Sequence, residues 1–100
     1  QPATRSLCDA LESPAPGLLT FPVLQKTVAD VALVTDAEVA EAMRYAFAVL
    51  KLVVEPGGSV GLAALLAGKV ADFGDNATGL ILSGGNVDPE LFARVLRREI

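Results

Sequence analysis

The sequence predicts an α/β fold, and three observations lead to this prediction. An apolar run at Gly79–Leu82 stops at the polar turn Ser83–Asn86. An amphipathic segment with a helix-capping signal lies earlier in the chain, and a segment with almost no polar residues separates the two. The expected order is strand, helix, helix, strand, helix, an alternation typical of α/β domains.

The first expected strand is Asp30–Val34, which is short and mostly apolar. Thr35 and Glu38 follow it in the pattern of a capping box, where each side chain accepts from the other residue's backbone amide. The next helix is expected to run to about residue 50, because apolar residues recur there at steps of three and four. The stripe expected to face the core consists of Val39, Met43, Phe47 and Leu50.

A second helix is expected from residue 58 or 59 to Lys69, after the break at Glu55-Pro56. Proline disfavours helical angles in the preceding residue, so Glu55 should be extended. The helix is apolar or small on almost every side, which predicts that it is buried. Gly57–Ser59 at its start could hold an anion with backbone amides, but a helix cap is favoured because no lysine or longer glycine loop accompanies it.

The second expected strand, Gly79–Leu82, follows a polar turn over Asp72–Thr78 and suits a parallel strand covered on both faces. A strand that breaks into glycines before a helix is where open α/β sheets place ligands. The alternative is a plain strand-to-helix turn. Asp88 then caps the last helix, with Pro89 at the favoured first position. The residues expected to face inward are Leu91, Phe92, Val95 and Leu96.

The segment before the first strand carries no recognisable chemistry. Glu12–Gly17 is loop by composition, with two prolines and a glycine. Leu18–Thr27 is mixed, and Pro22 is expected to exclude a long regular element.

The composition is unusual for a free-standing small domain. The chain has 100 residues, of which 52% are apolar and only 20% charged. We therefore expect it to bury surface against another subunit or against the rest of a larger fold. The absence of an initiating methionine at Gln1 favours a processed or cleaved chain. No apolar run approaches the roughly 20 residues that span a bilayer, and the N-terminus shows no charged, apolar and small-residue signal pattern. Neither membrane insertion nor secretion is therefore expected.

Charge and residue usage exclude several classes of function. The net charge is −4 and the basic residues are scattered, apart from Arg94, Arg97 and Arg98 on the last helix, which argues against a nucleic-acid partner. No histidine is present, which removes Ser-His and Cys-His catalysis and the commonest zinc ligand, and no metal site is expected. Cys8 is the single cysteine, so it is expected to be a small buried residue in a reduced, cytoplasmic protein.

Three segments resemble one known family in order and approximate spacing. They are Ser6–Leu11, where Ala10 replaces a common glycine; Lys51–Ala64, which contains Glu55-Pro56-Gly57-Gly58; and Ser83–Asp88, which reads Ser-Gly-Gly-Asn-Val-Asp. Together they resemble the serine/threonine dehydratase family of fold-type II pyridoxal-phosphate enzymes, which includes threonine ammonia-lyase and serine racemase.

The resemblance implies a particular place for the chain. Residues 1–100 would be the C-terminal portion of a cofactor-binding catalytic domain of the tryptophan synthase β-like type, with short strands packed against three helices. The family's Schiff-base lysine segment and its phosphate-binding glycine loop do not occur here. Lys26, Lys51 and Lys69 lie in other contexts. The chain alone is therefore expected to be inactive, with no catalytic residue of its own.

The resemblance also implies cofactor-binding residues. Ser83 matches the serine that hydrogen-bonds the pyridine nitrogen of pyridoxal 5'-phosphate. Gly84 and Gly85 would lie beside the ring, and Glu55 matches a glutamate near the cofactor. A neutral hydroxyl partner leaves the ring a moderate electron sink, which suits α-proton abstraction followed by β-elimination.

The expected parent protein is an enzyme of amino acid metabolism. The resemblance implies a pyridoxal-phosphate-dependent ammonia-lyase that converts threonine or serine to a 2-oxo acid and ammonia. A serine racemase of the same fold is the alternative within the class, and a non-catalytic α/β interaction module is the alternative outside it. The expected partners are the remainder of the enzyme chain, a hydroxy amino acid and further copies in a homo-oligomer.

Overall fold

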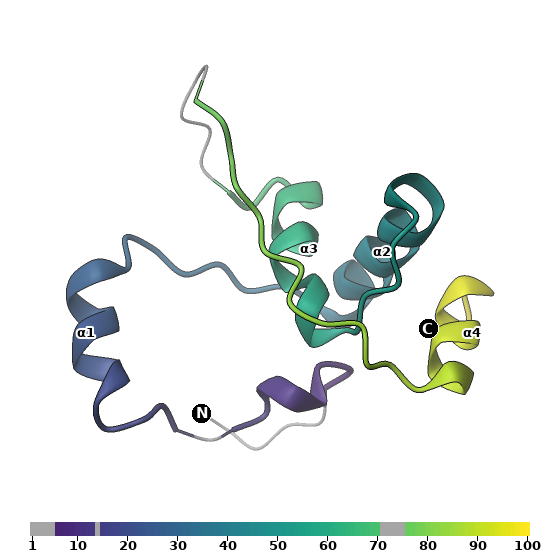
Figure 1. The fold of residues 1–100 in the computed structure, drawn as a ribbon. Coiled ribbons are helices and arrows are strands. Elements are labelled where there is room, and N and C mark those ends of the chain that lie inside the picture. The colour runs from purple at the N-terminus through teal and green to yellow at the C-terminus, as the bar shows by residue number, and fades with distance from the viewer. Residues whose placement is uncertain (1–5, 14, 71–75) are drawn as a thin grey trace.

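The structure, a computed structural model, describes residues 6–13, 15–70 and 76–100. Throughout these ranges the regular structure is helical (Figure 1). In chain order the elements are the 3-10 turn η1 (Asp9–Leu11), α1 (Thr20–Thr27), α2 (Asp36–Tyr45), the π-helical turn η2 (Ala46–Leu50), the 3-10 turn η3 (Gly57–Ser59), α3 (Val60–Leu66) and α4 (Pro89–Leu96).

The core lies around α2, which contacts both α3 and α4. Its centre is made of small and medium apolar side chains, so the helices approach closely. Partly buried residues from the 82–100 segment cover its edge. The buried core residues are Cys8, Val39, Ala40, Ala42, Met43, Ala46, Val54, Leu62, Ala63 and Val95.

α2 begins with the capping box that the sequence predicts. Thr35 Oγ1 accepts a hydrogen bond from the Glu38 amide at 3.1 Å, and Glu38 Oε1 accepts one from the Thr35 amide at 2.8 Å. The helical path continues through η2 to Leu50, as expected. Lys51 ends it with a left-handed φ of 61°.

The stripe predicted for this helix is only half right. Val39 and Met43 are buried, whereas Phe47 and Leu50 are each 42% exposed. A π-helical turn bonds residue i to i+5 and therefore breaks the spacing of three and four residues. Ala46 is buried in the core at the start of this turn.

α3 is shorter and less enclosed than predicted. Leu62, Ala63 and Ala64 are buried, but the next residues, Leu65 and Leu66, are exposed. The helix stops before Lys69 because Gly68 takes a left-handed φ of 72°, and the Lys69 amide closes the end by donating to the Ala64 carbonyl at 2.9 Å. The sequence predicts a helix that is buried on almost every side, and this prediction is wrong within the described chain.

α1 is a helix where the sequence predicted only mixed structure. Pro22 does not prevent it, because the proline lies in the first turn, where the amide has no intrahelical acceptor. α1 contacts no other helix of the described chain and stands apart on two irregular linkers (Figure 1). Leu18 and Leu19, just before it, are 93% and 88% exposed.

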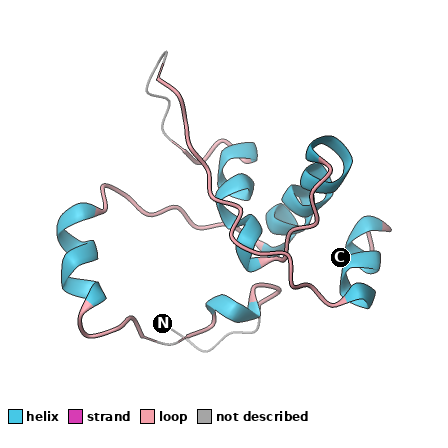
Figure 2. Ribbon diagram, viewed as in Figure 1, coloured by secondary structure: helices cyan, strands magenta, loops and turns pink. Residues whose placement is uncertain are grey.

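The short strands predicted at Asp30–Val34 and Gly79–Leu82 are not confirmed. Both segments are irregular, and the described chain contains no strand (Figure 2). A strand needs a neighbour to pair its backbone groups, and neither segment has one here. Gly79–Leu82 instead runs across α3, with Leu80 over Gly61, and leaves Ile81 83% exposed.

α4 forms as predicted. Asp88 accepts a hydrogen bond from the Leu91 amide at 3.0 Å, and Pro89 takes the first turn. Of the four residues expected to face inward, Val95 is fully buried and the others are half-buried. Phe92 meets Phe47 edge to face, with ring centroids 5.5 Å apart.

Three observations complete the fold. Lys69 Nζ donates to Glu38 Oε1 at 2.7 Å and to the Leu33 carbonyl at 2.8 Å, so it joins the end of α3 to α2 and the linker before it. Most of the polar turn predicted over Asp72–Thr78 lies outside the described residues. Of the helices that the structure describes, none is both long and apolar enough to cross a membrane.

Candidate functional site

The three segments that carried the sequence resemblance meet at one place in the fold. η1, from the first segment, contacts η3, from the second. A Cβ atom added to Gly57 would lie 3.5 Å from Leu11 and 3.7 Å from Ala10. The third segment reaches the same place, because the Glu55 amide donates to the Gly84 carbonyl at 2.9 Å.

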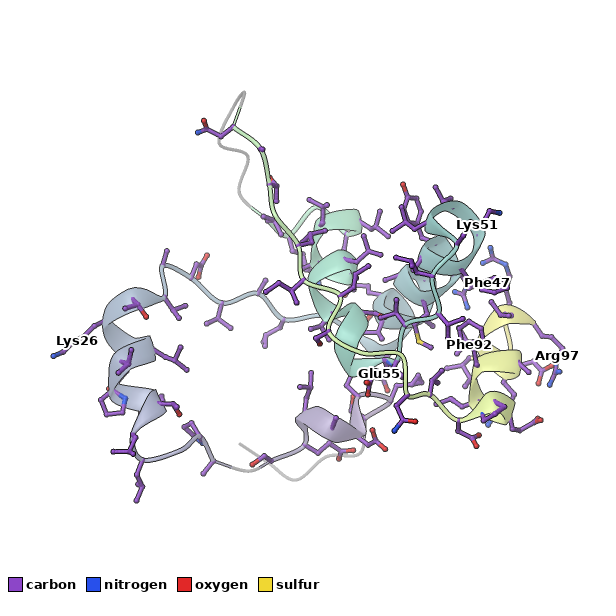
Figure 3. All side chains as sticks on the ribbon, viewed as in Figure 1. Lys26, Phe47, Lys51, Glu55, Phe92 and Arg97 are labelled. Carbon is purple, nitrogen blue, oxygen red and sulfur yellow. The ribbon has the colours of Figure 1, made fainter. Side chains whose placement is uncertain are left out.

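Glu55 lies directly against the glycine turn. Figure 3 shows its side chain beside the start of α3, next to η1. A Cβ at Gly84 would collide with Glu55 Oε1 and lie 3.1 Å from its Cδ. The Glu55 side chain therefore covers the face of Gly84 where any other residue would carry a side chain.

Two further glycines allow the backbones themselves to touch. A Cβ at Gly85 would lie 2.7 Å from the Val53 carbonyl oxygen, and one at Gly58 would lie 2.9 Å from the Gly84 amide nitrogen. Real Cβ atoms essentially never approach that closely. At Gly85 and Gly58 the turn Ser83–Gly85 thus packs on residues 53–58 through main-chain atoms, which leave no room for a side chain at either glycine.

The Glu55–Ser59 turn is held by its own hydrogen bonds. The Glu55 carbonyl accepts from the Gly58 amide at 3.1 Å and from Ser59 Oγ at 2.9 Å. Ser59 is fully buried and makes no side-chain cap at α3. The cap predicted for Gly57–Ser59 is therefore replaced by a bond that ties the hydroxyl back to Glu55.

Ser83, at the edge of this contact, is an exposed residue. Among the described residues it has no hydrogen-bond partner, and neither does the half-buried Glu55 carboxylate. Both side chains can thus accept a hydrogen bond from a ligand, and the Ser83 hydroxyl can also donate one.

Asp36 anchors the η1 side of the site, a role that the sequence did not reveal. Its carboxylate accepts from Ser6 Oγ at 2.9 Å and from the Leu7 amide at 3.2 Å. Asp36 is the first residue of α2, where a negative charge is also favoured by the helix dipole. The pattern Ser6…Asp36 spans 30 residues, so no local signal could have identified it.

Cys8 lies behind this anchor and is buried, as predicted. Burial raises the pKa of the Cys8 thiol above its ordinary value, despite a hydrogen bond with Ser6 that lowers it. The thiol is therefore kept protonated, which suits packing and disfavours a nucleophilic role.

No lysine of the described chain lies at this site. Lys51 Nζ donates to the Ala48 carbonyl at 2.8 Å, Lys69 is bound to Glu38 and Leu33, and Lys26 lies on the separate α1 (Figure 3). The described residues also include no cluster of three metal-ligating side chains. The geometry supplies a hydroxyl, a carboxylate and close-packed backbone, which can bind and orient a group.

The comparisons with known proteins agree on one family. Residues 1–84 match the family described as pyridoxal-phosphate dependent enzyme. An L-threo-3-hydroxyaspartate ammonia-lyase of Pseudomonas sp is 42% identical over 96 residues, or 96% of this chain and 29% of that protein. A serine racemase of Arabidopsis thaliana is 39% identical over 94 residues, or 87% of this chain and 27% of that protein.

An L-threonine ammonia-lyase of Geobacter sulfurreducens is similar over nearly the whole chain. It is 39% identical over 97 residues, which are 97% of this chain and 24% of that protein. The chain therefore spans between 24% and 29% of the length of these three curated relatives.

Proposed function

This chain belongs to the family of pyridoxal-phosphate dependent enzymes, and from that premise we propose that it is the C-terminal portion of the cofactor-binding domain of an ammonia-lyase. The substrate class is hydroxy amino acids, and the products are a 2-oxo acid and ammonia. Two of the relatives are ammonia-lyases for hydroxy amino acids. The observation that carries the proposal is the convergence of Glu55 and Ser83–Gly85 on one contact.

Ser83 is proposed to hold the pyridine nitrogen of pyridoxal phosphate. The residue is exposed and its hydroxyl has no partner among the described residues, so it is available to a ring nitrogen. Gly84 and Gly85 carry no side chain that would block the approach of a flat ring. Glu55 lies against Gly84 and is proposed to border the same cofactor.

The residues of this chain would orient the cofactor and leave proton transfer to others. When bound, pyridoxal phosphate supplies an electron sink for the substrate's α carbon. A neutral hydroxyl at Ser83 does not favour a protonated ring nitrogen as a carboxylate would. The lysine and the phosphate-binding loop are proposed to come from the remainder of the enzyme.

The exposed apolar side chains of this chain support the proposal that the remainder of the enzyme packs against it. The irregular segment Gly79–Leu82 is proposed to pair with neighbouring strands in the complete parallel sheet, as is Asp30–Val34. Such pairing would cover side chains that are open here and satisfy the backbone groups of both segments. The complete enzyme is proposed to be cytoplasmic and homo-oligomeric. Among the large apolar side chains of the described residues, the most exposed are Leu18, Leu19, Val31, Leu33 and Ile81.

A serine racemase is the second candidate function. The observation that favours it is the 39% identity to the Arabidopsis thaliana racemase, which is close to the identity of the lyases. Racemisation and elimination both begin by removing the α proton, so the same cofactor-orienting residues would serve either reaction.

The experiment is an assay of the full-length protein with pyridoxal phosphate and each of L-threonine, L-serine and L-threo-3-hydroxyaspartate. Formation of a 2-oxo acid with an equal amount of ammonia supports the lyase. Formation of D-serine, or of the Cα epimer of either other substrate, without ammonia supports the racemase. A protein that binds no pyridoxal phosphate and changes none of these substrates would contradict both, and would favour a non-catalytic interaction module.

A further inference from the structure

We propose that Gly58 is a positioning residue for the Ser83–Gly85 turn of the cofactor site. The proposal rests on the function proposed above, because it takes Ser83 as the group that holds the cofactor ring. It concerns a residue that would touch neither cofactor nor substrate and would act through the Gly84 backbone.

The contact is between two stretches of main chain. A Cβ on Gly58 would lie 2.9 Å from the Gly84 nitrogen and 3.0 Å from the Gly84 oxygen. Ordinary contacts of a Cβ begin at 3.4 Å, so the turn would have to move by about half an ångström. The Gly84 nitrogen is bonded to the Ser83 carbonyl carbon, so Ser83 would move with it.

The surroundings leave little freedom to absorb this displacement elsewhere. Gly58 is buried, and its amide donates to the Glu55 carbonyl, which also accepts from the buried Ser59 hydroxyl. The Gly84 carbonyl accepts from the Glu55 amide. One hydrogen-bonded turn therefore holds Gly58, and a second bond from the same turn holds Gly84.

Gly57 is a matched control one residue away. A Cβ there would lie 3.5 Å from Leu11 and 3.7 Å from Ala10, which are ordinary contacts with side chains. Both substitutions add one methyl group to the same 3-10 turn, η3. Neither position has a positive φ, so any difference between the two variants reports what the methyl group meets.

The test uses the full-length enzyme, its Gly58→Ala variant and its Gly57→Ala variant. Each apoenzyme is titrated with pyridoxal phosphate, and the absorbance spectrum of the bound cofactor and the kcat for 2-oxo acid formation are measured. A misplacement of about 1 Å lowers the reaction rate roughly 100-fold. A displacement of about half an ångström should therefore lower the kcat of Gly58→Ala about ten-fold and change the cofactor spectrum. The kcat of Gly57→Ala should stay within about two-fold of wild type.

A second variant separates positioning from simple overpacking. The third neighbour of an added Cβ at Gly58 is Val54 Cγ1, at 3.2 Å. Val54→Ala would relieve a clash with that side chain but not one with the Gly84 backbone. The kcat of the double variant Val54→Ala with Gly58→Ala should therefore be about ten-fold lower than that of Val54→Ala alone. This is the same loss that Gly58→Ala causes in the wild-type enzyme.

Three results would overturn the inference. They are equal kcat and spectra in Gly58→Ala and Gly57→Ala, full rescue by Val54→Ala, or a Gly58→Ala enzyme that does not fold, because the contact would then serve folding rather than position. A wild-type enzyme that binds no pyridoxal phosphate would instead refute the proposed function itself.

Discussion

Alanine substitutions at the two adjacent glycines, Gly84 and Gly85, should have different consequences. An added methyl group at Gly84 meets the end of the Glu55 side chain, whereas one at Gly85 meets the Val53 carbonyl oxygen at 2.7 Å. A carboxylate can rotate away at a cost of about 0.5–1.5 kcal/mol, but a carbonyl moves only with its backbone.

The magnitudes follow from these contacts. Neither glycine has a positive φ, so each Gly→Ala change gains about 0.4–1 kcal/mol by restricting the unfolded chain. For Gly84→Ala this gain nearly offsets the rotation of Glu55, and the net change should stay within about 1 kcal/mol. For Gly85→Ala the overpacking cost of about 1–3 kcal/mol exceeds this gain. The cost should lie toward the upper end of that range because the backbone at Val53 must shift.

The assay is urea unfolding of the full-length apoenzyme, with each variant made in the wild-type and Glu55→Ala backgrounds. With an m value of about 2 kcal/mol/M, Gly85→Ala should lower the midpoint by about 0.5–1 M. In the Glu55→Ala background, Gly84→Ala should become stabilising, while Gly85→Ala should be unchanged. Equal losses at the two positions, or additivity of Gly84→Ala with Glu55→Ala, would refute the reasoning.

Three further predictions concern the helices that support the site. Thr35→Ala removes the cap of α2 and should cost about 1 kcal/mol in the same unfolding assay. The hydrogen bond from Lys69 lowers the pKa of Glu38 below its ordinary value of 4.5. The ionised Glu38 therefore stabilises the fold above pH 4.5, and this contribution is lost as the pH falls through the lower pKa of the folded state. Glu38→Gln should flatten the dependence of the unfolding free energy on pH in that window. Arg44→Met removes the hydrogen bond to the Val95 carbonyl at 2.9 Å and should cost about 1.5–3 kcal/mol, whereas removal of an exposed arginine of α4 should cost less than about 0.5 kcal/mol; equal costs would contradict the role of Arg44 in holding α4.

The elements predicted well from sequence are those that local chemistry specifies. Thr35 with Glu38 and Asp88 with Pro89 mark helix starts, because a cap is a contact between residues three apart. The break at Glu55-Pro56 is equally local. The four residues of the two caps take the places that the sequence predicts.

The elements that the sequence predicts wrongly depend on distant parts of the chain or on local geometry that composition does not reveal. Nothing in the composition around Ala46–Leu50 distinguishes a π-helical turn from an α-helical one. An eight-residue helix with proline in its first turn, such as α1, is disfavoured by composition even though the backbone tolerates it. The strands at Asp30–Val34 and Gly79–Leu82 were expected from apolar runs alone, and pairing requires neighbours that a single segment cannot supply.

The candidate site was predicted by resemblance more than by physics. The glycines after Leu82 marked a ligand edge or a plain turn with equal weight. Only the folded chain shows that Glu55 covers Gly84 and that Gly58 touches its backbone, because those contacts join residues more than 25 positions apart.

The central claim, that the Ser83 hydroxyl holds the cofactor ring, is tested most directly by titrating the full-length Ser83→Ala apoenzyme with pyridoxal phosphate. Ser13→Ala is the control, since Ser13 is an exposed loop serine whose hydroxyl donates to the Ala15 carbonyl. One lost hydrogen bond of about 1 kcal/mol predicts a Kd about five-fold higher for Ser83→Ala, with a changed spectrum of the bound cofactor, and no change for Ser13→Ala. A Ser83→Ala enzyme with the affinity and spectrum of wild type would contradict the claim.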